Sequence, residues 1–410
     1  MPVSSAEAIS ITIDDNTELT SLAELLGRSA PGAAEVVVNL GALRHPNASV
    51  LLALMGWTAQ RVRHGCATKY QLPTSRIGRE LLRRLNYEHG FRSAVGTSLR
   101  SVMAPDQELY FESESRLTGS DIVGLEEAQI SEAAAQLQDR GFFQFRSWDS
   151  DPLHPKINLS GLHAELTQQE LRWSDELLIS LLSRRLGRDN VGYVSSHLVY
   201  EALSNAFRHA NSETIVSVEQ VYDVIKSNAG HRCGILRMAF WDNGDPVQET
   251  LRKSLLDGRN VINPDSRLLA VRFEMKSNVQ SNFDLEAANA RLLVKDPHAI
   301  PAEDLFLAAF LPGVTSEPEG FGATYHHLLR EKYPLLAAPG KGLFNMLNAV
   351  CTFLRGTLTA WSGGQAVTFM MHPSAEAEAA DRFVFTVACK KLPPDQFMGN
   401  LIAIELPLSA

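Results

Sequence analysis

The sequence predicts an α/β protein with two domains. Strand and helix patterns alternate in the first part of the chain, and a second set of apolar strand-like runs and amphipathic helices follows. The length of 410 residues and the hydrophobic content of 45% suffice for two ordinary cores, because a domain typically takes roughly 100–200 residues. We expect domains at 1–100 and 156–410, joined by a connector at 101–155.

The N-terminal domain is predicted from its strand–helix alternation. The apolar run 35–40 indicates a buried strand, and residues 49–63 indicate a helix with apolar side chains at three- and four-residue steps. A second short strand is expected at 69–72. Elements in this order with short joints favour a parallel sheet covered by helices.

The segment 198–213 carries the clearest functional pattern. Glu201, Asn205 and His209 are spaced at i, i+4 and i+8, so a helix would align them in one stripe. The apolar face beside this stripe consists of Val199, Ala202, Leu203, Ala206 and Ala210. An amide oxygen can bind a hard cation and a carboxylate can orient or deprotonate a hydroxyl, so the stripe suits a magnesium–triphosphate site. An amphipathic surface helix with ordinary polar residues would show the same spacing.

Two later segments add to this pattern. An apolar, strand-like run ends in Asp242, which can accept a hydrogen bond from an exocyclic amine, and Gly244 lets the backbone approach a flat base. At 338–343, glycines open an apolar helix and expose backbone N–H groups to anionic oxygens. Each segment alone is also compatible with an ordinary turn, but their order on one chain favours a shared site.

Together, the three segments resemble the GHKL ATP-binding superfamily, which includes DNA gyrase, sensor histidine kinases, MutL-type proteins and anti-sigma-factor kinases. Residues 201–210 resemble its N box, 241–246 its first glycine box and 340–343 its second. The resemblance covers roughly residues 155–410. It implies a Bergerat-type α/β sandwich, in which a mixed sheet carries helices on one face.

The resemblance also implies ATP and Mg²⁺ as cofactors. Asn205 would bind Mg²⁺, Glu201 would be the general base where hydrolysis or phosphotransfer occurs, and His209 would lie near the phosphates. Asp242 would bind the adenine amine, with Gly244 beside the base. The lid over the phosphates would include Gly340, Lys341, Gly342 and Leu343.

The chain departs from the family pattern in two places. Pro246 stands where the first glycine box usually carries a second glycine. A long insertion, at about 247–337, separates the two glycine boxes. Long loops are usually functional or have structure of their own, so we interpret the insertion as an elaborated lid or a partner surface.

The strand–helix pattern of residues 1–100 resembles a STAS domain, the fold of anti-sigma-factor antagonists. Residues 37–51 resemble its strand, its loop and the start of its phosphorylatable-serine helix. Ser49 occupies the position of the phosphorylatable serine, whereas Asn47 stands where an acidic residue is usual and Val50 where glycine is. These departures favour a plain helix N-cap for Ser49, a role worth about 1 kcal/mol.

Charge limits the classes of partner. The net charge of −9 argues against general nucleic-acid binding, which needs a concentrated positive surface. A helix expected at 76–85, closed by Asn86 and Gly90, carries a basic cluster that we interpret as a solvated face. This cluster consists of Arg76, Arg79, Arg83 and Arg84.

Cysteine spacing and hydropathy bound the environment. Cys66, Cys233, Cys351 and Cys389 share no metal or disulfide spacing, which favours a reducing cytoplasm. The chain does not begin with a signal pattern. Its apolar stretches are shorter than the ~20 residues of a membrane helix, so we expect a cytoplasmic protein without membrane contact.

Two functional hypotheses follow. In the first, the chain is an ATP/Mg-binding regulatory protein whose nucleotide controls a protein–protein interaction, with slow ATPase activity or a homodimer compatible with this role. In the second, it is an anti-sigma-like serine/threonine protein kinase acting on a STAS-type partner. The presence of Glu201 favours an enzyme that hydrolyses ATP or transfers its phosphate. The altered glycine box and the insertion favour the regulatory protein. A relative that binds no nucleotide is a third possibility.

Overall fold

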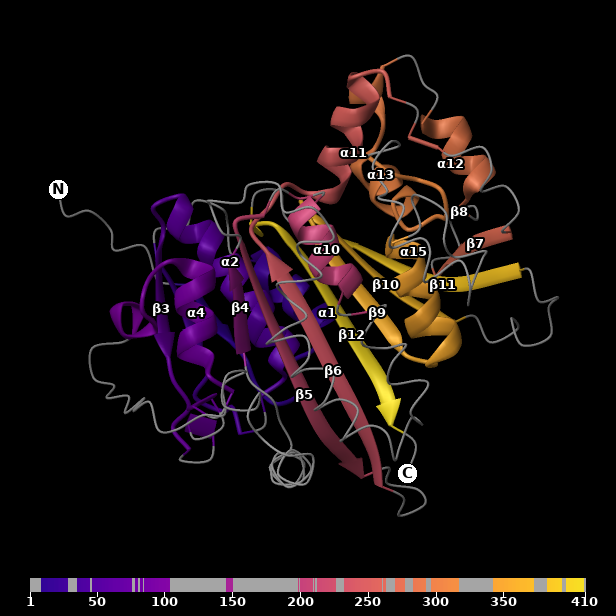
Figure 1. The fold of residues 1–410 in the computed structure, drawn as a ribbon. Coiled ribbons are helices and arrows are strands. Elements are labelled where there is room, and N and C mark those ends of the chain that lie inside the picture. Colours follow the sequence, from indigo (N-terminus) through magenta and orange to yellow (C-terminus); the bar gives the residue numbers. More distant parts are fainter. Residues whose placement is uncertain are drawn as a thin grey trace, which may run out of the picture.

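The protein is α/β with a mixed sheet (Figure 1). The computed structural model describes residues 9–28, 35–44, 46–75, 78–79, 82–83, 85–103, 145–149, 198, 200–208, 210, 212–225, 232–259, 261–262, 270–276, 283–292, 296–316, 342–371, 382–392 and 396–408. The predicted α/β class is confirmed at this level.

The N-terminal layer contains a three-stranded parallel sheet. Its strands, in spatial order, are β1 (Ile9–Thr12), β2 (Glu35–Asn39) and β3 (Ala67–Gln71). Its helices are α1 (Leu19–Arg28), α2 (Ala48–Arg63), α4 (Tyr87–Val95) and the 3-10 turn η1 (Leu99–Val102). The predicted strand–helix alternation and parallel pairing are confirmed.

Two local predictions in this layer are wrong. Asn47, not Ser49, is the N-cap of α2, because the Asn47 side chain accepts a hydrogen bond from the Ser49 backbone N–H at 3.1 Å. Ser49 lies inside the helix with its side chain buried. Gly90 closes no helix; it lies within α4, where a Cβ would approach the Cβ of Phe145 to 2.9 Å.

The larger sheet has nine strands in the order β4-β5-β6-β12-β9-β10-β11-β7-β8. They are β4 (Phe145–Asp149), β5 (Thr214–Ile225), β6 (Arg232–Asp242), β7 (Ala270–Met275), β8 (Phe283–Asp284), β9 (Thr357–Ser362), β10 (Gln365–Met371), β11 (Arg382–Lys391) and β12 (Asn400–Leu408). Strands β7 and β11 pair in parallel, and the other neighbours pair antiparallel.

Further helices cover one face of this sheet. They are α10 (Tyr200–Arg208), α11 (Val247–Leu256), α12 (Leu285–Leu292), the 3-10 turn η4 (Pro297–Ala299), α13 (Ala302–Ala308), α15 (Gly342–Leu347) and the π-helical turn η6 (Asn348–Phe353). Figure 1 shows α10, α11, α13 and α15 on the side of the long strands away from the N-terminal layer.

Helix α2 covers the opposite face of the nine-stranded sheet. All of its residues from 48 to 59 are buried, as expected for a helix held between two layers. Strand β6 alternates accordingly: Phe240 belongs to the core under α10 and α15, whereas Trp241 belongs to the core that contains α2. The next residue, Asp242, therefore faces the α10 side.

Candidate functional site

A cleft lies where α10, α11 and α15 meet the ends of β6 and β12. Its volume is about 100 Å³, whereas a single water needs only ~10–15 Å³. The polar residues that line it are Glu201, Asn205, Asp242, Asp245, Thr250, Thr315, Ser316 and Asn400. The cleft therefore brings together polar groups from segments that are far apart in the sequence.

Helix α10 carries the first two predicted site residues. Glu201 and Asn205 lie one turn apart and both line the cleft. The predicted apolar face is buried at Ala202, Leu203 and Ala206. The side-chain nitrogen Nδ2 of Asn205 is buried and has no hydrogen-bond partner among the described residues. Buried polar groups are rarely left unpaired, and this one belongs to a residue that lines the cleft.

Gly342 brings the start of α15 against these two side chains. A Cβ at this position would lie 2.8 Å from Oε2 of Glu201 and 3.4 Å from Oδ1 of Asn205. An added methyl group would have to displace the end of the Glu201 side chain. Leu343 also lines the cleft. His209, Gly340 and Lys341, the other predicted residues of the phosphate end, lie outside the described residues.

Asp242 ends β6, as the sequence predicted, and its side chain lines the cleft. Its Oδ1 accepts hydrogen bonds from the Ser212 hydroxyl at 2.8 Å, the Gly244 backbone N–H at 2.9 Å and the Asn400 side chain at 3.0 Å. Within the described residues, Oδ2 accepts none. Burial raises the pKa of Asp242 to about 6, against the opposing effect of these donors.

Asn400 is a site residue that the sequence reasoning missed. Besides Asp242, its Nδ2 donates to the backbone oxygen of Asp245 at 3.0 Å. Its Oδ1 accepts from the Ser362 hydroxyl at 2.6 Å and from the Val247 backbone N–H at 3.2 Å. Asn400 thus ties β9, β12 and the start of α11 to the carboxylate. A polar residue that opens an apolar strand was the available signal.

Gly244 has a packing role. A Cβ there would lie 2.2 Å from the backbone oxygen of Ala210, which accepts a hydrogen bond from the Asp245 N–H at 2.7 Å. The glycine joins the turn after β6 to the end of the α10 segment. Gly244 is not among the described residues that line the cleft.

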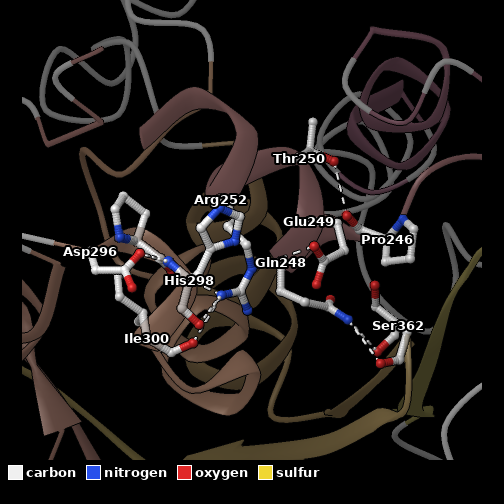
Figure 2. Close-up of polar contacts among 11 residues, drawn as sticks. Pro246, Gln248, Glu249, Thr250, Arg252, Asp296, His298, Ile300 and Ser362 are labelled. Atoms are coloured by element: carbon white, nitrogen blue, oxygen red, sulfur yellow. Dashed lines mark hydrogen bonds and ion pairs between the residues drawn. The ribbon is translucent and has the colours of Figure 1, made fainter. Parts of the chain in front are cut away.

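The insertion supplies one wall of the cleft. Its lining residues are Val247, Thr250, Leu251, Phe306, Ala309, Phe310, Val314, Thr315 and Ser316. Figure 2 shows how polar contacts hold α11 in place. Gln248 donates to the backbone oxygens of Ser362 at 3.1 Å and Gly363 at 3.0 Å. At the other end, Nη1 of Arg252 donates to backbone oxygens between residues 297 and 300.

The charge of the cleft is one-sided. Glu201, Asp242 and Asp245 line it, whereas no lysine, arginine or histidine is among its described lining residues. No cluster of three or more His, Cys, Asp or Glu side chains suited to a metal occurs in the described part of the chain. The arrangement suits a ligand that offers hydrogen-bond donors at one end and a cation at the other.

No protein-family model, curated protein or solved structure matches this chain. Within the described residues, no helix is both long and apolar enough to span a membrane. The cleft itself therefore carries the functional argument.

Proposed function

We propose that this chain is a GHKL-type regulatory protein that binds ATP with Mg²⁺ and uses the nucleotide to control a protein–protein interaction. The observation that carries the proposal is the convergence of Glu201, Asn205, Asp242 and Gly342 on one cleft. Helices over one face of the mixed sheet support a Bergerat-type sandwich. The parallel N-terminal sheet with α2 supports a STAS-like domain.

The base would lie at the Asp242 end of the cleft. Three donors hold Oδ1 in place, which leaves Oδ2 to accept a hydrogen bond from the exocyclic amine of adenine. The carboxylate is fixed before the ligand arrives, so binding would require little rearrangement.

The phosphates would lie at the α10–α15 end. The Asn205 amide has an unpaired nitrogen, so no internal hydrogen bond opposes the orientation that presents its oxygen to Mg²⁺. The Gly342 backbone lies directly against Glu201 and Asn205 at this end of the cleft. When bound, the cation would offset the charge of the triphosphate in a cleft already lined by carboxylates.

A specific observation favours ATP hydrolysis or phosphate transfer as the second candidate function. The Glu201 carboxylate faces Gly342 in the cleft, where a general base for hydrolysis or for transfer to a partner serine would stand. The chain's own Ser49 does not fit as the acceptor: its side chain is 2% exposed, in the core on the opposite face of the sheet. If the protein is a kinase, the acceptor serine must therefore belong to a separate STAS-type partner.

Calorimetric titration with ATP and MgCl₂ tests the proposal. Wild-type protein should bind ATP with Mg²⁺, and Asn205→Ala should remove the magnesium dependence. Asn348→Ala is the matched control, since Asn348 has a buried, unpaired side-chain oxygen outside the cleft lining. The proposal would be refuted if titration with any adenine nucleotide gave no heat and no thermal shift.

ATP labelled at the γ-phosphate separates the two candidates. Free labelled phosphate, or label on a serine of a co-purified protein, would establish chemistry, and Glu201→Gln should abolish it. If intact ATP were recovered from both the wild-type protein and Glu201→Gln, only the regulatory hypothesis would remain.

A further inference from the structure

Helix α2 contacts the nine-stranded sheet directly behind the cleft. A Cβ on Gly56 would lie 2.4 Å from Nε1 of Trp241 and 2.9 Å from two ring carbons of Phe397. Only glycine permits this approach. Trp241 is fully buried in the contact and precedes Asp242 in the chain. The N-terminal layer and the cleft are therefore separated by the thickness of one sheet.

Trp241 holds the turn that leads into β12. Its Nε1–H donates to the backbone oxygen of Met398 at 2.7 Å. Gly399 follows with φ of 73°, and a Cβ there would lie 1.6 Å from the backbone oxygen of Asp242. The turn is thus fixed by the indole on one side and by the end of β6 on the other.

The same turn sets the position of Asn400. Asn400 lies opposite Asp242 in the β6–β12 ladder, and its Nδ2 is 3.0 Å from Oδ1 of Asp242. A displacement of the Trp241 indole would move Met398 and with it the amide that holds the carboxylate. Packed cores transmit such shifts because they contain little free volume.

A second contact fixes the register of α2 on the sheet. Gln220 of β5 donates through Nε2 to the backbone oxygen of Pro46 at 2.8 Å, and its Oε1 accepts from the Ala48 backbone N–H at 3.1 Å. The Gln220 side chain is buried. Two buried hydrogen bonds at the start of α2 thus define where Gly56 meets Trp241.

We propose that the N-terminal layer positions the Asp242 carboxylate for its ligand, with Gly56 and Trp241 as positioning residues that act through Met398 and Asn400. The ligand is the nucleotide of the proposed function, on which this inference rests. Because coupling between two binding equilibria is reciprocal, nucleotide would in turn strengthen the docking of α2.

Three substitutions test the inference in the full-length chain. Trp241→Phe keeps an aromatic ring but removes the donor to Met398, and Gly56→Ala displaces the indole. Gly90→Ala is the matched control: it crowds Phe145 at the same kind of helix–sheet contact, on edge strand β4. Calorimetry should show affinity for Mg–ATP reduced about tenfold by the first two. The control should change it less than about twofold, since distant sites act independently.

A ligand-free measurement keeps the inference separate from the proposed function. The Asn400 hydrogen bond lowers the pKa of Asp242, so its loosening should raise the Asp242 midpoint in a ¹³C-carboxyl NMR titration. Trp241→Phe and Gly56→Ala should show this rise, and Gly90→Ala should not. An unchanged midpoint in both test variants, or an equal rise in the control, would overturn the inference. Wild-type protein that binds no ATP would refute the proposed function alone.

Discussion

The side-chain amide of Asn400 and the carboxylate of Asp242 form a buried hydrogen bond between the ends of two neighbouring strands, 3.0 Å from Nδ2 to Oδ1. Asn400 donates to Asp242 and Asp245 and accepts from Ser362 and Val247. Both polar ends of the amide are therefore used, and the orientation of Asn400 is determined by its neighbours.

Replacing this donor by an acceptor should make the free energy of unfolding depend more steeply on pH than it does in wild type. In Asn400→Asp, a carboxylate would face Oδ1 of Asp242 in place of an N–H group. We expect urea denaturation at pH 8 to show a loss of about 2–4 kcal/mol in the free energy of unfolding. Much of the loss should be recovered at pH 5, where the pair holds a proton.

Asn243→Asp is the control for this substitution. The Asn243 Oδ1 accepts hydrogen bonds from the backbone N–H groups of Glu213 and Thr214, both at 3.0 Å. A carboxylate would retain both bonds, so the control should be close to wild type at pH 8. Equal losses in the two variants would contradict the role assigned to the Asn400 amide.

Asp242→Asn should stabilise the ligand-free protein at alkaline pH. Burial raises the pKa of Asp242 from 3.8 to about 6, so the folded state binds a proton more tightly than the unfolded state does. The resulting stabilisation is complete below pH 3.8 and is lost as the pH rises through about 6. An uncharged amide avoids that loss, which is worth at most about 3 kcal/mol.

Urea denaturation at pH 4 and pH 8 measures this effect. The variant should be the more stable protein at pH 8, and the two should be similar at pH 4. ATP affinity should fall in the same variant, because an amide N–H replaces the free acceptor oxygen. A variant less stable than wild type at pH 8 would show that the buried charge is not a cost to folding.

The local parts of the site could be predicted from sequence. The spacing of Glu201 and Asn205 is a property of one helix, and the end of β6 at Asp242 follows from an apolar run that stops at a turn. Both predictions needed only neighbouring residues. The structure confirms the α10 helix and the strand end at Asp242.

The contacts between distant segments could not be predicted in this way. Asn400 reaches Asp242 only because β12 lies beside β6, and the two residues are 158 positions apart. In the sequence, Gly56 is an ordinary position in an apolar helix, and its role is visible only in its contact with Trp241 of β6. The N-cap was misassigned because Asn47 and Ser49 are both good capping residues, and the actual start of the helix decides between them.

Gly342→Ala should weaken Mg–ATP binding without lowering the free energy of unfolding. Gly342 is the first residue of α15, and a Cβ there would meet only the end of the flexible Glu201 side chain closer than 3 Å, so the variant should unfold at a similar urea concentration. The added methyl group would press on Glu201 and Asn205 and reduce the space for the phosphates. Calorimetry should therefore show weaker Mg–ATP binding without a loss of stability. Unchanged affinity would place the phosphates elsewhere.

Arg252→Ala should loosen the wall that the insertion adds to the cleft. Arg252 Nη1 donates to the backbone oxygens of Pro297, His298 and Ile300 at 2.9, 3.2 and 3.1 Å (Figure 2). Removing a donor shared by three carbonyls, of which those of Pro297 and Ile300 are partly buried, should cost about 1–3 kcal/mol. Hydrogen exchange should accelerate at residues 296–300 and in α11.

The matched control is Arg259→Ala, since the ion pair of Arg259 with Asp257 is half exposed at 3.8 Å. Such exposed pairs contribute about 0–1 kcal/mol, so exchange in the same region should not change. Because α11 supplies Val247, Thr250 and Leu251 to the cleft, Arg252→Ala should also weaken nucleotide binding. Faster exchange at full affinity would show that this wall of the cleft does not contact the ligand.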